Sequence, residues 1–252
     1  ERLEEPLNAV EVQGVTRQQR QFWSFQLPVA FALPPLHEQW GVRSPVDVFV
    51  QEALGANQLK PAPRATKRVL LRRASFDLTG LPPAVGEIGR FVQDVSPDAF
   101  PRVLDRLLAS PRYGERWGRH WLDVARYADS NGLDENLAYG NAFRYRDYVI
   151  SAFNRDKPYD DFVIEQLAGD RLADGDSGAT EEHITATGFL SLGAKMLAED
   201  DPVKMQMDIV DEQLDTVGRA FMGLTLGCAR CHDHKFDPIS TAEYYSLAGI
   251  FK

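Results

Sequence analysis

The sequence predicts a mainly α-helical protein, an irregular multi-helix domain with one minor β element near its N-terminus. Apolar residues recur at spacings of three and four over several stretches of about ten residues or more, which is the period of a helix with one buried face. Capping residues and prolines precede several of these stretches, as they do at helix starts. Only one short stretch alternates apolar and polar residues as a strand does.

Composition sets the class of protein. The 252 residues are 44% hydrophobic and 26% charged, which is ordinary for a globular protein with a substantial core. The net charge is −9 and no run of Lys or Arg forms a stripe, so we expect no nucleic-acid partner. No apolar run approaches the length of a membrane span. We expect a flexible lead-in over residues 1–20 and a single helical domain over 21–252.

The first half of the chain supplies the β element and four helices. Residues 21–27 alternate apolar and polar and are bounded by Pro28, which predicts the strand. The apolar spacing predicts helices over 45–54, 65–76, 96–108 and 111–129. Ser96 followed by Pro97 is typical of a helix start, and Gly132 follows the end of the fourth helix.

The second half continues in helices, predicted over 143–153, from 157 to Gly169, and from Thr180 onwards. The longest one begins at Asp201-Pro202 and carries an apolar stripe to Phe221. A capping-box pattern at residues 240–243 opens the last helix. Because the sequence stops inside that helix, we expect it to be a fragment of a longer protein.

The strongest chemical signal is Cys228-Ala229-Arg230-Cys231-His232, a C-x-x-C-H motif that holds both cysteines of the chain. This spacing lets two thiols form thioethers with one haem while the adjacent histidine becomes the proximal iron ligand. The motif therefore predicts one covalent haem c per chain.

Three other interpretations remain open. A redox dithiol has the same C-x-x-C spacing but is expected in a βαβ setting. Zinc could bind Cys228, Cys231, His232 and His234, although structural zinc sites usually take their second pair of ligands from a distant segment. The cysteines could also be inert residues of a structural module.

Four blocks of sequence look familiar: residues 71–83, 113–129, 157–170 and 223–238, the last of which contains the motif. Together they resemble the planctomycete cytochrome c-like family of large exported proteins. The resemblance covers roughly residues 20 to 252 and implies a haem-bearing extracytoplasmic protein, periplasmic or at the cell surface. Its partner would be a redox protein or other domains of the same polypeptide. The resemblance does not imply a reaction.

The second axial ligand of the iron must come from upstream if it exists. Only 20 residues follow His232, none of them is Met, and His234 is too close in sequence to reach the opposite face. We consider His120 first, because it lies in a dense family block between two tryptophans, and Met207 second, because it lies on the apolar stripe leading to the motif. Core packing is the simpler explanation of each.

Polar residues beside the motif suggest further roles. Asp233, His234 and Asp237 could form a second shell that orients His232 or tunes the iron. Two functions follow from the haem interpretation: an exported c-type cytochrome domain that relays electrons, or a haem enzyme, peroxidase-like or oxidative and carbohydrate-active, with an open distal site. A zinc-binding or structural module is the third possibility.

Overall fold

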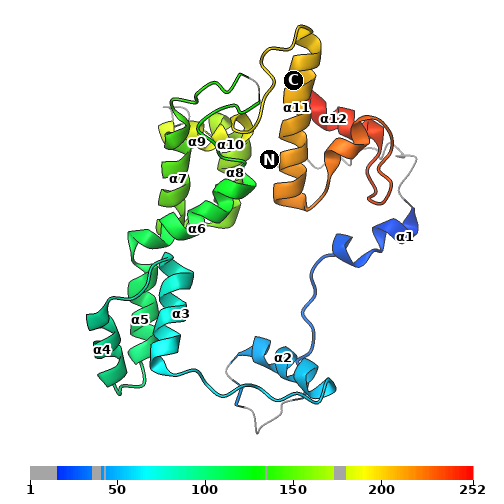
Figure 1. Ribbon diagram of the computed structural model, residues 1–252. Helices are drawn as coiled ribbons and strands as arrows, with labels where there is room; N and C mark the ends of the chain where they lie inside the picture. The colour runs from blue at the N-terminus through cyan, green and yellow to red at the C-terminus, as the bar shows by residue number, and fades with distance from the viewer. Residues whose placement is uncertain (1–15, 36–40, 43, 134, 173–179, 252) are drawn as a thin grey trace.

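The computed structural model describes residues 16–35, 41–42, 44–133, 135–172 and 180–251. The described part of the chain is mainly helical, and its only β contact is an isolated antiparallel bridge between Ser130 and Ala138. Figure 1 shows the helices strung along an open arc, with the N-terminal segment on the side opposite the green helices. The predicted mainly α class is confirmed.

The N-terminal segment contains short elements joined by extended chain: α1 (Arg17–Arg20), η1 (Trp23–Phe25) and α2 (Pro45–Ala56). The predicted strand at residues 21–27 is wrong, because these residues form the turn that follows α1, the 3-10 turn η1 and the two residues after it. Alternating apolar residues make a strand only where a neighbouring strand accepts their backbone groups, and the described chain offers none here. The predicted lead-in at 1–20 lies mostly outside the described residues.

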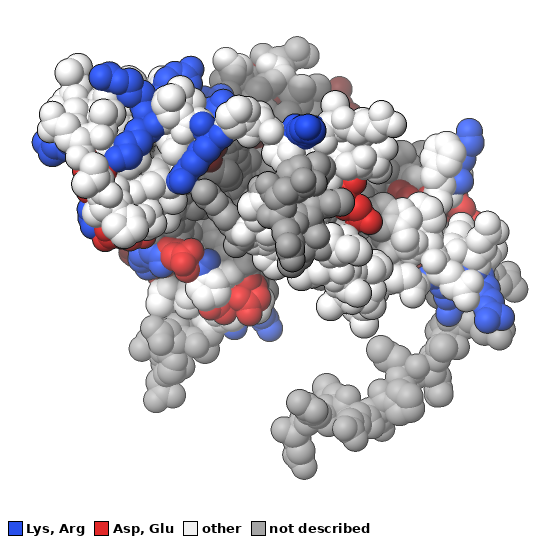
Figure 2. Space-filling view, turned by 90° about the horizontal axis from the view of Figure 1, so that it is seen from below, with Lys and Arg blue, Asp and Glu red and all other residues white. Residues whose placement is uncertain are grey.

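Three helices form the next unit: α3 (Lys67–Thr79), α4 (Val85–Gln93) and α5 (Ala99–Leu108). They bury a small core of Leu71, Phe91, Ala99, Val103 and Leu107. Helix α3 ends at Gly80 with φ of +71°, a conformation that glycine adopts without steric cost. Seen from below, Lys and Arg side chains gather over the left-hand end of the molecule, where this unit lies (Figure 2).

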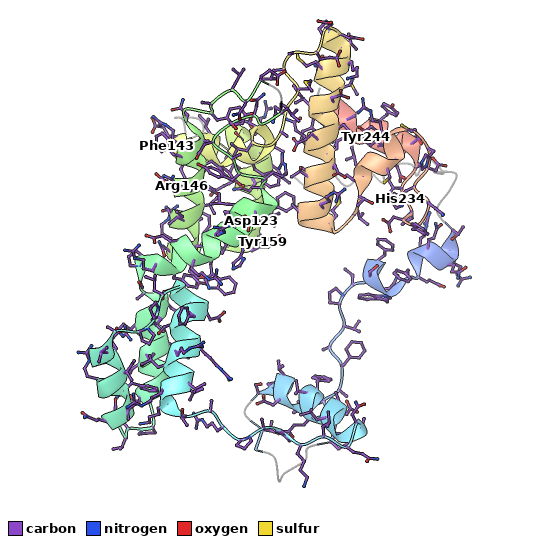
Figure 3. The ribbon with its side chains drawn as sticks, viewed as in Figure 1. Asp123, Phe143, Arg146, Tyr159, His234 and Tyr244 are labelled. Carbon is purple, nitrogen blue, oxygen red and sulfur yellow. The ribbon has the colours of Figure 1, made fainter. Side chains whose placement is uncertain are left out.

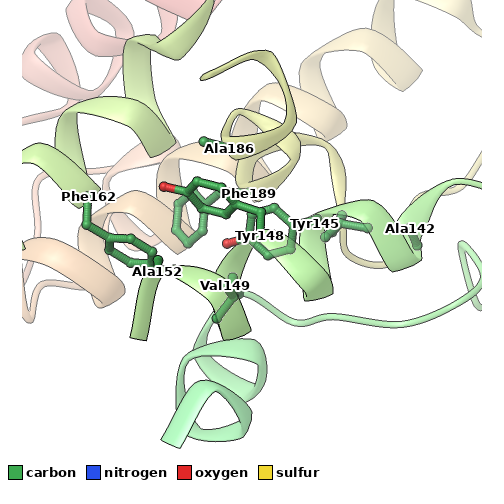
Figure 4. Packing of buried hydrophobic residues seen from close by; sticks show 10 residues of the cluster. Ala142, Tyr145, Tyr148, Val149, Ala152, Phe162, Ala186 and Phe189 are labelled. Carbon is green, nitrogen blue, oxygen red and sulfur yellow. The ribbon is translucent and has the colours of Figure 1, made fainter. Parts of the chain in front are cut away.

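A larger unit holds the main core. It comprises α6 (Pro111–Val124), α7 (Ala142–Asn154), α8 (Tyr159–Ala168), η3 (Gly169–Arg171), α9 (Glu181–Ala186) and α10 (Gly188–Ser191). Figure 4 shows the rings of Tyr148, Phe162 and Phe189 lying together in this core. The rings of Tyr148 and Phe162 are stacked with centroids 5.9 Å apart. Gly114 lets α6 approach α7 closely, since a Cβ there would lie 2.4 Å from the Ile150 carbonyl oxygen.

The last unit consists of α11 (Pro202–Val217), the π-helical turn η5 (Gly218–Met222), the 3-10 turn η6 (Leu226–Arg230) and α12 (Thr241–Phe251). Its core contains Val210, Leu214, Leu226, Ala229, Ile239, Tyr244 and Ala248. The predicted long helix that begins at Asp201-Pro202 is confirmed as α11. The predicted capping box at residues 240–243 is confirmed at the start of α12. None of the helices in the described part of the chain combines the length and apolar character that a membrane crossing requires.

Apolar packing and an ion pair are among the contacts that join this last unit to the main core. The Phe221 ring packs against Trp121 and Phe189, with centroids 5.8 and 5.2 Å apart. The Arg126 guanidinium lies 2.5 Å from the Glu212 carboxylate of α11 and also donates to the Leu192 carbonyl oxygen. Because apolar packing and a half-buried ion pair act together, α11 is held to the main core along its side.

Replacing Phe189 by Ala tests the main core. The side chain is fully buried among Trp121 and Phe221, so we expect the free energy of unfolding to fall by about 3–5 kcal/mol. Urea denaturation followed by circular dichroism measures the change. The control is Phe31→Ala, because Phe31 is 78% exposed and the same truncation there should cost less than about 0.5 kcal/mol. Equal losses in both variants would refute the placement of Phe189.

Acid should weaken the contact between α7 and α9. A hydrogen bond from Arg155, with a second one from Lys157, lowers the pKa of Glu182 from 4.5 to about 2. Since the folded-state pKa lies below the unfolded one, this carboxylate stabilises the fold above about pH 4.5 and loses that effect as the pH falls towards 2. The urea midpoint of Glu182→Gln should therefore fall less between pH 5 and 2.5 than that of the parent protein. Parallel pH profiles would contradict the assignment.

Candidate functional site

The site begins with α11, the helix that supports the motif. Pro202 occupies its first turn, and the Asp201 side chain accepts hydrogen bonds from the backbone N–H groups of Val203 and Lys204 at 2.9 and 3.1 Å. These are the cap and the proline that start a helix efficiently. Along its length α11 buries Val210 and Leu214 against the segment that carries the motif.

The chain turns back on α11 through a very close approach. After η5 it reverses at Gly223, whose φ is +66°, and the Leu224 N–H donates to the Gly218 carbonyl oxygen at 3.0 Å. A Cβ at Gly218 would lie 2.6 Å from the Leu226 side chain and 2.8 Å from the Leu224 oxygen. A larger residue at 218 would therefore displace the segment that leads into the motif.

Within the motif, the two residues between the cysteines point inward. Ala229 is fully buried in the core of this unit. The Arg230 guanidinium lies 2.8 Å from the Asp208 carboxylate and 3.3 Å from that of Asp211, both on α11. Hydrogen bonds from Lys204 and Arg230 lower the pKa of Asp208, so it stays ionised as a partner for the arginine.

The three residues with ligand chemistry point outward instead. Cys228, Cys231 and His232 are all exposed, and both thiols are free. The 3-10 turn η6 thus divides the motif into an anchored inner side and a solvent-facing side that carries two sulfurs and an imidazole.

His232 is oriented by its own backbone. Its Nδ1 lies 2.8 Å from the Asp233 carbonyl oxygen, and because a carbonyl can only accept, Nδ1 carries the proton. The neutral ring then presents an unprotonated Nε2 to solvent. A histidine that binds a metal ordinarily donates its second ring nitrogen to an oxygen in this way, so the geometry is that of an available ligand.

His234 has a different environment. Its side chain is 7% exposed, and Nδ1 accepts from the backbone N–H groups of Phe236 and Asp237 at 3.2 and 2.7 Å. Nε2 must then carry the proton and donate to Thr225 Oγ1 at 3.0 Å. The Asp237 carboxylate lies 3.6 Å from Nδ1, but the two do not form an ion pair because this ring is neutral. His234 therefore braces the loop that follows the motif.

Asp233 joins that loop to α12. Its side chain accepts the backbone N–H of Thr241 at 2.9 Å, at the first residue of the helix. Ser240 and Glu243 complete the helix start by exchanging hydrogen bonds of 2.7 and 3.2 Å. The predicted second shell of Asp233, His234 and Asp237 thus has structural contacts within the loop, and its action on an iron stays a prediction.

The two candidates for a sixth ligand lie in different units. His120 is exposed on α6 and its ring packs against Trp117 at 5.4 Å. Figure 3 shows α6, with Asp123 near its end, across from the unit that carries His234 and Tyr244. Met207 is half-buried on α11, one turn before Val210 and next to Asp208, which binds Arg230. The structure thus places Met207, rather than His120, on the helix that supports the motif.

The four residues of the zinc interpretation do not form a ready metal site in this structure. Among the residues that the structure describes, no three His, Cys, Asp or Glu side chains are grouped to hold a metal ion. Of the four ligands that the zinc interpretation requires, His234 has both ring nitrogens engaged in hydrogen bonds. Zinc binding would therefore require the loop after the motif to rearrange.

Sequence reasoning missed the residues that hold the motif in place. Arg230 occupies a variable position of C-x-x-C-H, and its partners lie about twenty residues earlier on α11. A usable signal was the spacing of Asp208 and Asp211, which puts two carboxylates on one face of the helix leading to the motif.

A protein family of unknown function, PSCyt2 (DUF1549), matches residues 45–252. The chain belongs to this family. The match includes the motif and every helix from α2 onwards, so the site is part of the PSCyt2 domain and not an addition to it. No curated protein and no solved structure matches the chain.

Replacing His234 by Ala tests its bracing role. The substitution leaves two backbone N–H groups and the Thr225 hydroxyl without their partner, which should lower the free energy of unfolding by about 1–3 kcal/mol. Lys235→Ala is the control, because that exposed neighbour contacts, among the described residues, the Phe236 ring by a cation–π interaction and should change stability by less than about 0.5 kcal/mol. Chemical denaturation measures both. A His234→Ala variant as stable as Lys235→Ala would contradict the bracing role.

Proposed function

We propose that this protein is an exported c-type cytochrome domain that binds one haem covalently and relays electrons. The observation that supports the proposal best is the division of the motif: Ala229 and Arg230 are anchored, while Cys228, Cys231 and His232 face outward. A thioether forms only if each sulfur can reach a vinyl group of the same haem, so exposure of both thiols from one short turn is what attachment requires.

The residues present fit a haem. His232 offers Nε2 as the proximal ligand, and the Asp233 carbonyl oxygen holds its Nδ1 proton. When bound, haem supplies single-electron chemistry whose potential depends on axial ligands, hydrogen bonds and burial. The chain's own contribution is to hold the turn: the ion pairs of Arg230 with Asp208 and Asp211 fix it on α11, and the His234 brace fixes the segment after it.

Localisation and partners follow from the cofactor. In bacteria c-type haem is attached outside the cytoplasm, so the proposal includes a periplasmic or cell-surface location. The electron partner is a redox protein or another domain of the same polypeptide. Attachment through two covalent bonds suits such a location because the haem is retained where it could otherwise diffuse away.

A haem enzyme is the second candidate, and the exposure of the motif favours it. Because Cys228, Cys231 and His232 are all exposed, the described residues leave the surroundings of a bound haem open to small molecules. An electron-transfer haem is usually six-coordinate, whereas a peroxidase-like or oxidative site needs a free position on the iron.

Co-production of the chain with a c-type maturation system tests the proposal. We expect a c-type α-band in the reduced pyridine adduct, and haem staining that survives denaturing electrophoresis, because the link is covalent. Cys228→Ala with Cys231→Ala should abolish the stained band, whereas His120→Ala should retain it. The absence of haem under these conditions, with zinc found by metal analysis, would overturn the proposal in favour of a zinc-binding or structural module.

The native spectrum separates the two haem functions. Low-spin six-coordinate iron that is inert to cyanide supports electron relay, and its conversion to high spin in Met207→Ala would identify the sixth ligand. High-spin iron that binds cyanide or peroxide rapidly would contradict electron relay and support the enzyme.

A further inference from the structure

An open cavity lies where α3 and α5 meet α6, and we call it the α3 cavity. Its volume is about 610 Å³, which is within the range of about 300–1,000 Å³ that is usual for small-molecule sites. Helix α3 supplies most of the lining, α5 supplies Phe100 and Leu104, and α6 supplies Arg116. Figure 2 shows Lys and Arg side chains gathered over the end of the molecule that contains α3.

The charge of the α3 cavity is opposite to that of the whole protein. The chain has a net charge of −9, yet Arg72, Arg73 and Arg116 line this cavity with Asp77 as the single carboxylate among the lining residues. Within the part of the chain that the structure describes, neither Arg73 nor Arg116 forms a hydrogen bond or an ion pair. The cavity therefore has an excess of positive charge that the surrounding described residues do not neutralise.

Two other arginines of the same unit are paired. The Arg102 guanidinium lies 2.6 Å from the Asp94 carboxylate, and that of Arg106 lies 2.6 Å from Glu87. Neither carboxylate lines the α3 cavity. The unit thus neutralises these two arginines internally and leaves the charges of the cavity available to a ligand.

Arg116 is held in place at the end of α3. A Cβ at Gly80 would lie 3.2 Å from the Arg116 Cδ atom, so the stem of the arginine packs on this glycine. The Arg116 Nε atom is buried and has no hydrogen-bond partner among the described residues. Burial of a charged donor without an acceptor is unfavourable. An anion bound beside the guanidinium would offset this cost by supplying the opposite charge.

Apolar side chains line the rest of the α3 cavity. Phe76 is 41% exposed, and the Arg72 guanidinium lies over its ring at 5.3 Å from the centroid. Phe100 packs on the buried Phe91 ring with centroids 6.0 Å apart, and Leu104 is half-buried beside it in α5. A simple inorganic ion would leave this surface in contact with water, whereas a ligand with an apolar body would cover it.

We propose that the α3 cavity binds a small amphipathic anion, a molecule in which a carboxylate, sulfonate or phosphate group is joined to an apolar or aromatic body. The guanidinium groups of Arg73 and Arg116 bind the charged group, since planar guanidinium groups match the geometry of such oxyanions. Phe76 and Phe100 contact the body of the ligand. The inference is independent of the haem, because the C-x-x-C-H motif lies in a different unit.

Isothermal titration calorimetry with anilinonaphthalene sulfonate tests the proposal, since this probe joins a sulfonate to aromatic rings. We expect one probe to bind per chain. Phenylnaphthylamine, which has the same rings without the sulfonate, and inorganic sulfate, which has no apolar body, should each bind at least about tenfold more weakly. Equal binding of the neutral compound would reduce the site to an apolar surface. Equal binding of sulfate would show that the apolar lining contributes nothing. Either result would overturn the proposal.

Three matched arginine variants show whether the probe binds in the α3 cavity. Arg73→Gln and Arg116→Gln should each weaken binding at least about tenfold. Arg73 is exposed, so its variant remains informative if circular dichroism shows that Arg116→Gln does not fold. Arg64→Gln is the control, because it removes the same charge from an exposed residue outside the lining. In about 0.15 M salt it should change the affinity less than about twofold. Equal losses in all three variants would contradict a specific site.

Nuclear magnetic resonance locates the bound probe independently of the variants. The methyl signals of Leu104, which lines the α3 cavity, should shift on titration. Those of Leu27, which is 88% exposed near the N-terminus, should not. Shifts at Leu27 without shifts at Leu104 would show that the probe binds an exposed apolar segment instead, and would overturn the assignment.

Discussion

The anchoring of η6 on α11 is the interaction on which the candidate site depends. The two exposed cysteines and the exposed histidine do little to hold the turn in one conformation, because exposed side chains contribute little packing energy. The residues between the cysteines stabilise the turn instead: Ala229 is buried in the core and Arg230 binds two carboxylates. The two carboxylates give the Arg230 guanidinium a defined position against α11, so the ion pairs orient the turn while the burial of Ala229 supplies packing.

The same helix connects the motif to the rest of the protein. On one side α11 holds η6 and α12, and on the other its Glu212 binds Arg126 beside the main core. Phe221, just after the helix, packs against both Trp121 and Phe189. Because apolar packing and ion pairs from both units act on one helix, the position of the motif relative to the main core is fixed by α11 and not by the loops.

The elements that the sequence predicts correctly are those whose stabilising contacts are local or periodic. Helix α11 has a cap, a proline and a long apolar stripe, and α12 has its capping box. The nine-residue α4 was missed because it contains Gly86 and Gly89 and follows two prolines, which together resemble a loop. The predicted strand failed because a strand depends on a neighbour that a local pattern does not reveal. The candidate ligand residues Cys228, Cys231 and His232 were proposed from the C-x-x-C-H spacing, and their role stays a prediction. The Arg230 anchor was not predicted, because it depends on contacts distant in sequence.

The solvent accessibility of the Cys228 and Cys231 thiols can be measured directly. Native protein without haem is treated with a chromogenic thiol reagent, and the rates are compared with those in denaturant. Since Cys228 and Cys231 are both exposed and free, both should react in the native state at rates close to those of the unfolded chain. Asp208→Asn with Asp211→Asn should leave these rates high, because the anchor lies on the other side of the turn. Native thiols that react only after unfolding would contradict the arrangement on which the haem proposal rests.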